Sequence, residues 1–429
     1  MPGSDTPVTF RQHARFYLSQ SFISGIGYTL ARVLGLLFTV VVARAFGPAD
    51  FGLIRSIISV AGLVTIVVAP LPTTLSRYLA TYRNDSGEVD RYFTNSMVII
   101  TAMLLCTLTA TGWYLREEPL TLTLGTLLVA CGITAFNTYT ELTRGLDNIW
   151  RMSHYYVVAN LVQLMAVVLC FSGLALHSVG LALAIYGLSP LLPILFFELR
   201  ARSPARLRLR LITPTTMWKL CYFSVPLVIA HASYTIWGTL DLLIVEQGLG
   251  PQSAGIYAAA KTAVLVFLFV PYAVTTVALR YFARGSKRDA QRSLLLSAGA
   301  SIIASAALVA GFWGFSGPLV KAVFGQRYSS ASHLLILLAA GMAVYTVYLN
   351  FETWMVAKGY PWLHALGMST TMIVSTIVEL VLLPHRGLQG VAIGSTVGIA
   401  AGTVVIGGLY GLLAAREAHA ARLASVPAV

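Results

Sequence analysis

The chain has 429 residues, of which 57% are hydrophobic and only 10% are charged. Its 29 Lys and Arg residues outnumber its 16 Asp and Glu residues, which gives a formal net charge of +13. Soluble proteins carry about 25% charged residues, and one or two globular cores cannot hide so much apolar surface. The composition therefore excludes a soluble enzyme and predicts an integral membrane protein.

Apolar windows between charged, Gly and Pro residues predict twelve membrane-spanning helices, because each window reaches the roughly 20 residues that a crossing needs. The six N-terminal spans are expected at 20–46, 50–76, 92–114, 119–143, 152–172 and 177–199. The six C-terminal spans are expected at 217–246, 254–279, 293–316, 331–357, 362–383 and 388–414. A backbone in lipid must satisfy its own hydrogen bonds, so the expected fold class is all-α.

Lys and Arg residues gather in the connections on one side of these spans, as at Arg77, Arg144 and Arg202. Short cytoplasmic loops retain positive charge. We therefore expect both termini in the cytoplasm and the chain in the cytoplasmic (inner) membrane. Topology and contact with anionic membrane lipids account for the basic balance, so no nucleic-acid partner is expected.

Two short motifs recur at one offset. The segment 47–52 (GPADFG) has a counterpart at 250–255 (GPQSAG), and 77–80 (RYLA) has one at 280–283 (RYFA). In both pairs the copies are separated by the same number of residues. A repeat of six spans gives both halves the same orientation, so it predicts two six-helix lobes related by a pseudo-two-fold axis along the membrane normal.

The expected domains are an N-terminal lobe at 1–199, a basic cytoplasmic linker at 200–216 and a C-terminal lobe at 217–429. The linker contains five Arg residues and two Pro residues between 200 and 214. Two interpretations of it remain open. It is either a solvated linker that follows the positive-inside rule or an amphipathic segment on anionic headgroups.

Three cations fall within predicted spans. An ionisable side chain at membrane depth costs about 2.5–3.5 kcal/mol on insertion scales, so it usually faces a cavity or a partner. Arg32 shares one polar or small helical face with Gly35 and Thr39. Arg55 and Lys261 lie one helical turn from equivalence in the repeat. These three residues are the candidate ligands of an anionic substrate.

Asp241 is the main acidic candidate near the outer end of the seventh span. It is expected to pair with Lys261, to bind a coupling cation or to exchange a proton, and the sequence leaves these alternatives open. His231, on the same helical face, suits a proton relay or a structural hydrogen bond.

Three further acids fall near span ends. Glu141 is expected to pair with Arg144 three residues later. Glu352 is a further coupling or ion-pair candidate near the inner end of the tenth span, and Glu379 is expected to snorkel to the outer face. The spacing shows no metal site, and no resident cofactor is expected. H⁺, Na⁺ and the membrane potential remain open as energy sources.

Five motifs mark the connections between the spans. They read ARAFGPADFGLIRS (43–56), LSRYLA (75–80), LTRG (142–145), GLGPQSAGIYAAAK (248–261) and FGQRYSSAS (324–332). Together they resemble the polysaccharide flippase family, the Wzx-type lipid-linked oligosaccharide translocases. Multidrug and toxin extruders and lipid II flippases belong to the same superfamily, so the resemblance implies a MATE-like fold over most of the chain.

The resemblance also implies a function. We expect a flippase that moves a polyprenyl-pyrophosphate-linked oligosaccharide across the cytoplasmic membrane by alternating access, with cavity cations holding the pyrophosphate. The product would serve surface polysaccharide biosynthesis, such as lipopolysaccharide O-antigen, capsule or exopolysaccharide. Membrane lipids and polysaccharide polymerase machinery are the expected partners.

Three alternatives differ in what they require. A cation-coupled multidrug extruder favours an acidic, aromatic cavity for cationic substrates. A glycan polymerase or ligase usually has a substantial outer loop with catalytic groups, whereas the predicted outer connections are short, so enzymatic activity is not expected. A scaffold without transport does not need Arg32, Arg55 and Lys261 within the membrane.

Overall fold

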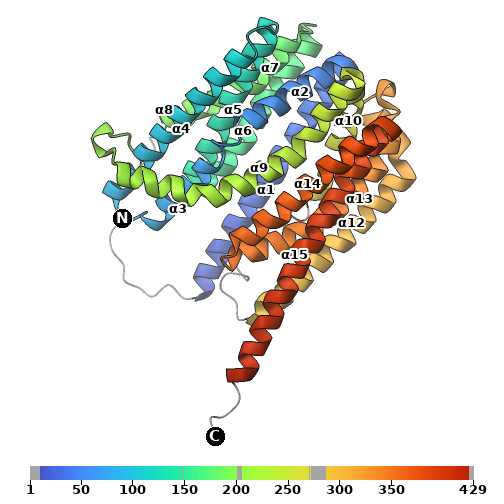
Figure 1. Ribbon diagram of the computed structural model, residues 1–429. Coiled ribbons are helices and arrows are strands. Elements are labelled where there is room, and N and C mark those ends of the chain that lie inside the picture. Colours follow the sequence, from blue (N-terminus) through green and yellow to red (C-terminus); the bar gives the residue numbers. More distant parts are fainter. Residues whose placement is uncertain (1–9, 147, 201–204, 270, 272–286, 425–429) are drawn as a thin grey trace.

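The computed structural model describes residues 10–146, 148–200, 205–269, 271 and 287–424. Within these ranges all regular structure is helical, and ten helical stretches are long and apolar enough to cross a membrane. The predicted all-α, multi-pass membrane fold is confirmed. Figure 1 shows the N-terminal half, in blue to green, packed side by side with the C-terminal half, in yellow to red.

The helices follow one another closely, and most are joined by short connections. In the N-terminal lobe they are α1 Phe10–Phe46, α2 Pro48–Val64, α3 Pro70–Thr81, α4 Ser86–Tyr114, α5 Leu120–Gly145, α6 Ile149–Val167, the π-helical turn η1 Val168–Gly173, α7 Val179–Leu188 and α8 Leu191–Arg200. After the 3₁₀ turn η2 Leu209–Leu211 come α9 Pro214–Leu249, α10 Pro251–Val264, the 3₁₀ turn η3 Leu265–Leu268, α12 Lys287–Val323, the 3₁₀ turn η4 Gln326–Tyr328, α13 Ala331–Ala357, α14 Pro361–Arg386 and α15 Leu388–Ala424.

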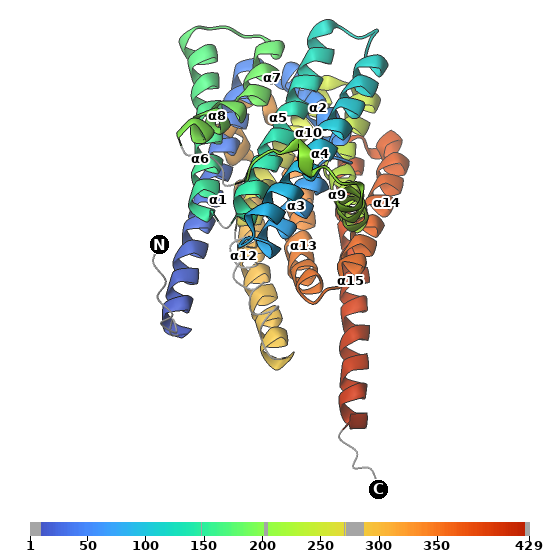
Figure 2. The same cartoon turned by 90° about the vertical axis from the view of Figure 1, so that its left-hand side faces the viewer.

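The bundle has two ends. We call the lower end in Figure 2, where the turns at 82–85 and 358–360 lie, the basic end. The turns at 115–119 and 387 lie at the other end, which we call the opposite end. Helices α1, α12 and α15 extend furthest at the basic end.

Two predicted spans differ from the structure. The second, at 50–76, is divided into α2 and α3 by turns at 65–69. Pro70 explains the division, because it has no N–H to continue the helix and its ring clashes with the preceding turn. The eighth, at 254–279, begins as α10 and η3, and its remainder continues beyond the continuously described residues. The repeated motif at 280–283 also lies outside them.

Helix α9 contacts both lobes. It packs against α2, α3 and α4 on one side and against α10, α14 and α15 on the other. Near the basic end, Ser224 Oγ lies 2.8 Å from Thr74 Oγ1 of α3, and the Arg77 guanidinium lies 4.0 Å from the centroid of the Phe223 ring. Pro226 follows within the same helix. These contacts connect the lobes near the basic end of the bundle.

A second set of contacts connects the lobes at the opposite end. Arg44, in the last turn of α1, donates to the carbonyl oxygen of Val323 at 2.7 Å and to that of Ala322. The Tyr328 hydroxyl donates to the Ala43 carbonyl oxygen at 2.8 Å. Burial raises the pKa of Tyr328, so its phenol stays protonated and keeps this donor. Helices α2 and α10 pack together at the same end.

The linker is attached to the N-terminal lobe in its described part, and its two sequence interpretations stay open because residues 206–210 are exposed. Its residues from Ala205 onward lie along α4 and are fixed there by side chains of that helix. Asp90 accepts a hydrogen bond from the Arg206 backbone N–H at 2.8 Å and forms an ion pair with Arg208, whose Nε lies 2.8 Å from Asp90 Oδ2. Asn95 binds the backbone at Leu211 and Thr213. The linker is therefore a strap on the N-terminal lobe, because buried polar side chains of α4 satisfy its backbone.

Candidate functional site

A cavity of about 740 Å³ lies between the two lobes. Its walls come from α1, α2, α5, α6 and α7 of the N-terminal lobe and from α9, α10 and η3 of the C-terminal lobe. It extends to Arg144, in the last turn of α5 at the basic end, whose side chain is exposed. At the opposite end, the contacts of α1 and α2 with the C-terminal lobe lie beyond it. The lining combines apolar, aromatic and polar side chains.

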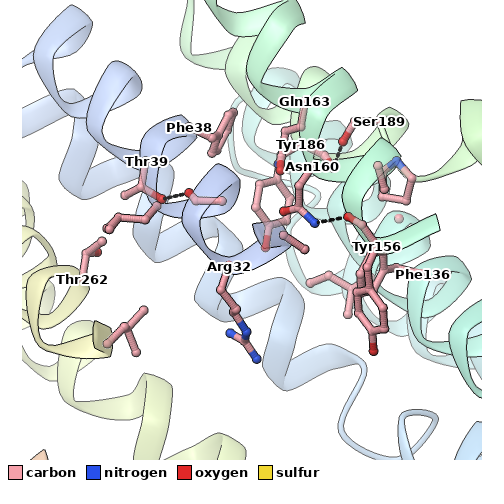
Figure 3. Close-up of a pocket in the computed structure, with 18 of the residues that line it drawn as sticks. Arg32, Phe38, Thr39, Phe136, Tyr156, Asn160, Gln163, Tyr186, Ser189 and Thr262 are labelled. Atoms are coloured by element: carbon pink, nitrogen blue, oxygen red, sulfur yellow. Dashed lines mark hydrogen bonds between the residues drawn. The ribbon is translucent and has the colours of Figure 1, made fainter. Parts of the chain in front are cut away.

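Arg32 and Arg55, two of the predicted substrate ligands, both line this cavity. Arg32 is an exposed side chain of α1, on the helical face that also carries Gly35 and Thr39. Figure 3 shows Arg32 extending from α1 between Thr262 and the side chains of α5 and α6. Arg55 is partly buried on α2, and its Nε is buried without a hydrogen-bond partner among the described residues. The structure thus brings these two guanidinium groups to one cavity.

The electrostatic balance of the lining is positive. Arg144 is the third lining cation and is paired with Glu141 at 2.8 Å, as the sequence predicts. Among the described lining residues, none is Asp or Glu. Guanidinium groups bind phosphate oxygens bidentately and stay charged even when partly desolvated. The lining therefore suits a phosphate-bearing ligand.

Lys261, the third predicted substrate ligand, is placed differently. Its Nζ lies 2.6 Å from Asp241 Oδ2 and 2.8 Å from the Gly238 carbonyl oxygen, and it is not among the lining residues. Asp241 is 1% exposed and also accepts from the Tyr257 hydroxyl at 2.8 Å and from the Leu242 backbone N–H. The ion pair, one of the alternatives that the sequence left open, is present within the C-terminal lobe.

Glu379 does not snorkel to the outer face, and this expectation was wrong. It is 1% exposed, and Ser375 Oγ donates to its carboxylate at 2.5 Å. The reason is the close packing of α14 on α15, where a Cβ added at Gly394 would meet the backbone and side chain of Glu379. The small residues of α15 let that helix cover the carboxylate.

The other two candidates lie away from the cavity lining. His231 is partly buried on α9, and Glu352, on α13, lies 3.6 Å from the His364 Nε2 atom. Neither belongs to the lining. Across the described ranges, no group of three or more His, Cys, Asp or Glu residues has the arrangement of a metal site.

The sequence analysis missed a group of uncharged polar residues in the cavity. Asn137 comes from α5, Asn160 and Gln163 from α6, and Tyr186 and Ser189 from α7 and its end. The signal was present, because Tyr156, Asn160 and Gln163 have the i, i+4, i+7 spacing of one helical face.

The family comparison covers more than half of the chain. A family model described as polysaccharide biosynthesis protein matches residues 18–286. A protein of Haloferax volcanii, the probable low-salt glycan biosynthesis flippase Agl15, is 23% identical over 182 residues. That alignment covers 42% of this chain and 39% of the relative. The chain therefore aligns with less than half of that relative's length.

Solved structures show the same fold at low sequence identity. An inward-facing multidrug resistance MATE family transporter of the MOP superfamily superposes with a TM-score of 0.74 at 14% identity, over 92% of this chain and 96% of that one. The lipid II flippase MurJ, in an inward closed conformation, also gives a TM-score of 0.74 at 14% identity, over 91% of this chain and 87% of that one. The two-lobe architecture predicted from the sequence agrees with this fold.

Proposed function

Because the chain belongs to the polysaccharide biosynthesis protein family, we propose that it is a flippase for a polyprenyl-pyrophosphate-linked oligosaccharide. The substrate would cross the cytoplasmic membrane for the biosynthesis of a surface polysaccharide. The flippase named Agl15 and the lipid II flippase with the same fold support this class of substrate. No enzymatic step is part of the proposal.

The pair of arginines in the cavity is the main support for this proposal. Arg32 and Arg55 line a cavity without a lining carboxylate, and Arg55 Nε lacks a partner among the described residues. A buried donor without a partner is costly, and a pyrophosphate oxygen would satisfy it. Lys261 is the counter-ion of Asp241 in this arrangement, so we assign phosphate binding to the two arginines.

The contacts between the lobes suit alternating access. One set joins α3 to α9 near the basic end, and the other joins α1 and α2 to the C-terminal lobe at the opposite end. The cavity reaches the basic end at Arg144. With that end in the cytoplasm, as the positive-inside rule predicts, the headgroup would enter from the cytoplasm and leave after the opposite contacts part. The isoprenoid tail would stay in lipid.

The membrane potential would assist this direction. Moving one elementary charge through a potential of 100 mV is worth about 2.3 kcal/mol. A pyrophosphate is an anion, so its outward movement is favourable when the cytoplasm is negative. Coupling to H⁺ or Na⁺ at Asp241 would add to this force.

The same fold also serves a multidrug resistance transporter, so an extruder is the second candidate. Aromatic side chains at Phe136, Tyr156 and Tyr234 in the lining favour it. The arginines oppose it, because a positive cavity repels the cationic drugs that many extruders carry.

Native mass spectrometry of the purified full chain tests the proposal with two probes, undecaprenyl pyrophosphate and the cation ethidium. We expect selective retention of the pyrophosphate. The double substitution Arg32→Gln, Arg55→Gln should weaken it at least tenfold, because a hydrogen bond to a charged group is worth about 1.5–3 kcal/mol. Arg116→Gln, which changes an exposed arginine outside the cavity, is the matched control.

Retention of ethidium in preference to the pyrophosphate would support the extruder. Equal pyrophosphate binding by the double variant and the control would remove the assigned role of the arginines. Selective binding should be followed by a flipping assay in proteoliposomes, where the same ranking of variants is expected.

A further inference from the structure

The cavity wall formed by α5, α6 and α7 carries two side-chain amides that have no hydrogen-bond partner among the described residues. Gln163 is 8% exposed and lines the cavity, and its side chain makes no hydrogen bond to any described residue. The Asn137 side chain also lines the cavity and makes none within the described part of the chain. The amide atoms of these two residues are not among the buried polar atoms that lack a partner, so they are accessible from the cavity. Polar side chains that line a cavity and make no hydrogen bond to the described residues are available to orient a ligand there.

The wall is organised along one helical face. Tyr156, Asn160 and Gln163 follow one another at spacings of four and three residues on α6. Asn160 Nδ2 donates to the Tyr156 carbonyl oxygen at 2.8 Å, which fixes its rotamer. Figure 3 shows Asn160, Gln163 and Tyr186 together on the side of the cavity that faces Arg32 and Thr39 of α1.

Aromatic rings flank these amides. Phe136 and Tyr156, both in the lining, pack edge to face with ring centroids 5.3 Å apart. Tyr186 packs against Phe38 with centroids 6.0 Å apart, and Arg55 lines the same cavity. The wall therefore combines apolar ring faces with uncharged donors and acceptors next to a cation. A pocket that recognises phosphate alone needs the cation and does not need the amides.

A sugar matches this combination. Each hydroxyl of a pyranose both donates and accepts, as does a side-chain amide, and the C–H face of the ring is apolar. We propose that the α5–α6–α7 wall is the glycan subsite of the cavity, with Gln163 and Asn137 bound to sugar hydroxyls and Asn160 held in place by Tyr156. This inference rests on the proposed function, since it places the sugar beside the phosphate ligand Arg55. A site built to bind a hydroxyl discriminates strongly against a ligand that lacks it, so these amides set glycan preference.

The test separates sugar recognition from phosphate recognition by using two probes. One is undecaprenyl pyrophosphate, which has no sugar. The other is the lipid-linked oligosaccharide fraction extracted from cells of the source organism that lack this protein. Native mass spectrometry of the full chain gives the ratio of the two affinities. We expect the wild-type protein to bind the oligosaccharide form at least tenfold more tightly than the bare pyrophosphate.

Gln163→Met keeps the length of the side chain and removes its amide. It should lower the affinity ratio by about tenfold per lost pair of hydrogen bonds while leaving the affinity for bare undecaprenyl pyrophosphate unchanged. Asn137→Leu on α5 tests the same wall if the α6 variant does not fold. Gln291→Leu, which changes an exposed glutamine of α12, is the matched control and should keep the wild-type ratio.

The outcomes distinguish this inference from the proposed function. Equal binding of both probes by the wild-type protein would overturn the glycan subsite and leave the pyrophosphate flippase intact. An equal loss of both affinities in Gln163→Met, or no loss in either amide variant, would also overturn the subsite. Binding of neither probe by the wild-type protein would overturn both proposals.

Discussion

Gly52 of α2 and Gly255 of α10 occupy equivalent positions in the repeated motif, and each packs against the first residue of the other's helix. A Cβ added at Gly52 would overlap the carbonyl oxygen of Pro251, and one added at Gly255 would overlap that of Pro48. The two helices therefore meet backbone to backbone, because only glycine permits so close an approach. This meeting point lies at the opposite end of the bundle, beyond the cavity.

Gly52→Leu should separate α2 from α10 and open the cavity at the opposite end. The physical reason is that a side chain at this position has no space. The measurement is the labelling of a cysteine at Thr39, a cavity residue that is 8% exposed, by a membrane-impermeant maleimide applied from that side. The four native cysteines are replaced first. We expect several-fold faster labelling than without the glycine substitution.

The matched control for this experiment is Gly62→Leu on the same helix. A Cβ at Gly62 meets no atom within 4 Å, so this variant should label at the original rate. Equal rates in the two folded variants would show that the Gly52 contact does not close the cavity.

Lys261→Gln should destabilise the protein, because it leaves the carboxylate of Asp241 buried and unpaired. Breaking a buried ion pair from one side costs about 3–5 kcal/mol, and the Asp241 side chain is 0% exposed. The double variant Lys261→Gln, Asp241→Asn should recover most of the loss. Thermal unfolding in detergent measures both. A Lys261→Gln protein that is as stable as the wild type but no longer binds undecaprenyl pyrophosphate would instead make Lys261 a substrate ligand.

Much of the fold was predictable from local patterns, because each crossing needs a long apolar stretch and the repeat fixes the two lobes. The break after Val64 was also encoded, by Pro70 and Pro72 within one apolar window. The attachment of the linker was not predictable in this way. It depends on Asp90 and Asn95 of α4, which lie more than 100 residues before their partners.

The charged part of the site was easier to predict than the uncharged part. Arg32 and Arg55 are conspicuous because a cation is costly in a membrane, and both line the cavity. An uncharged amide such as that of Gln163 costs less free energy in a membrane than a cation does, so in the sequence it resembles an ordinary packing residue. Only the structure shows that it lines the cavity without a hydrogen-bond partner among the described residues. The burial of Glu379 depends on Gly390, Gly394 and Gly398, whose spacing of four on α15 allows close packing against α14. The spacing of these glycines is visible in the sequence. The sequence does not show that they pack against the face of α14 that carries Glu379.

The orientation can be tested with two single cysteines at exposed loop positions. Asn84→Cys lies in the turn before α4 at the basic end, and Glu117→Cys lies in the turn before α5 at the opposite end. Because short basic connections stay in the cytoplasm, we expect an impermeant maleimide to label Glu117→Cys in intact cells. Asn84→Cys should require permeabilised cells. The reverse pattern would place the termini outside and contradict the proposed direction of transport.

Asp90→Ala should release the linker from α4 at one point. The substitution removes the acceptor of the Arg206 N–H and the ion-pair partner of Arg208, and a hydrogen bond to a charged group is worth about 1.5–3 kcal/mol. Hydrogen exchange should become faster at Arg206, whereas Thr213, whose N–H is held by Asn95, should keep its protection. Glu88→Ala is the control, because Glu88 pairs only with Arg91 among the described residues and is partly exposed. Unchanged exchange at Arg206 would mean that the strap is held by Thr94 and Asn95 without the carboxylate.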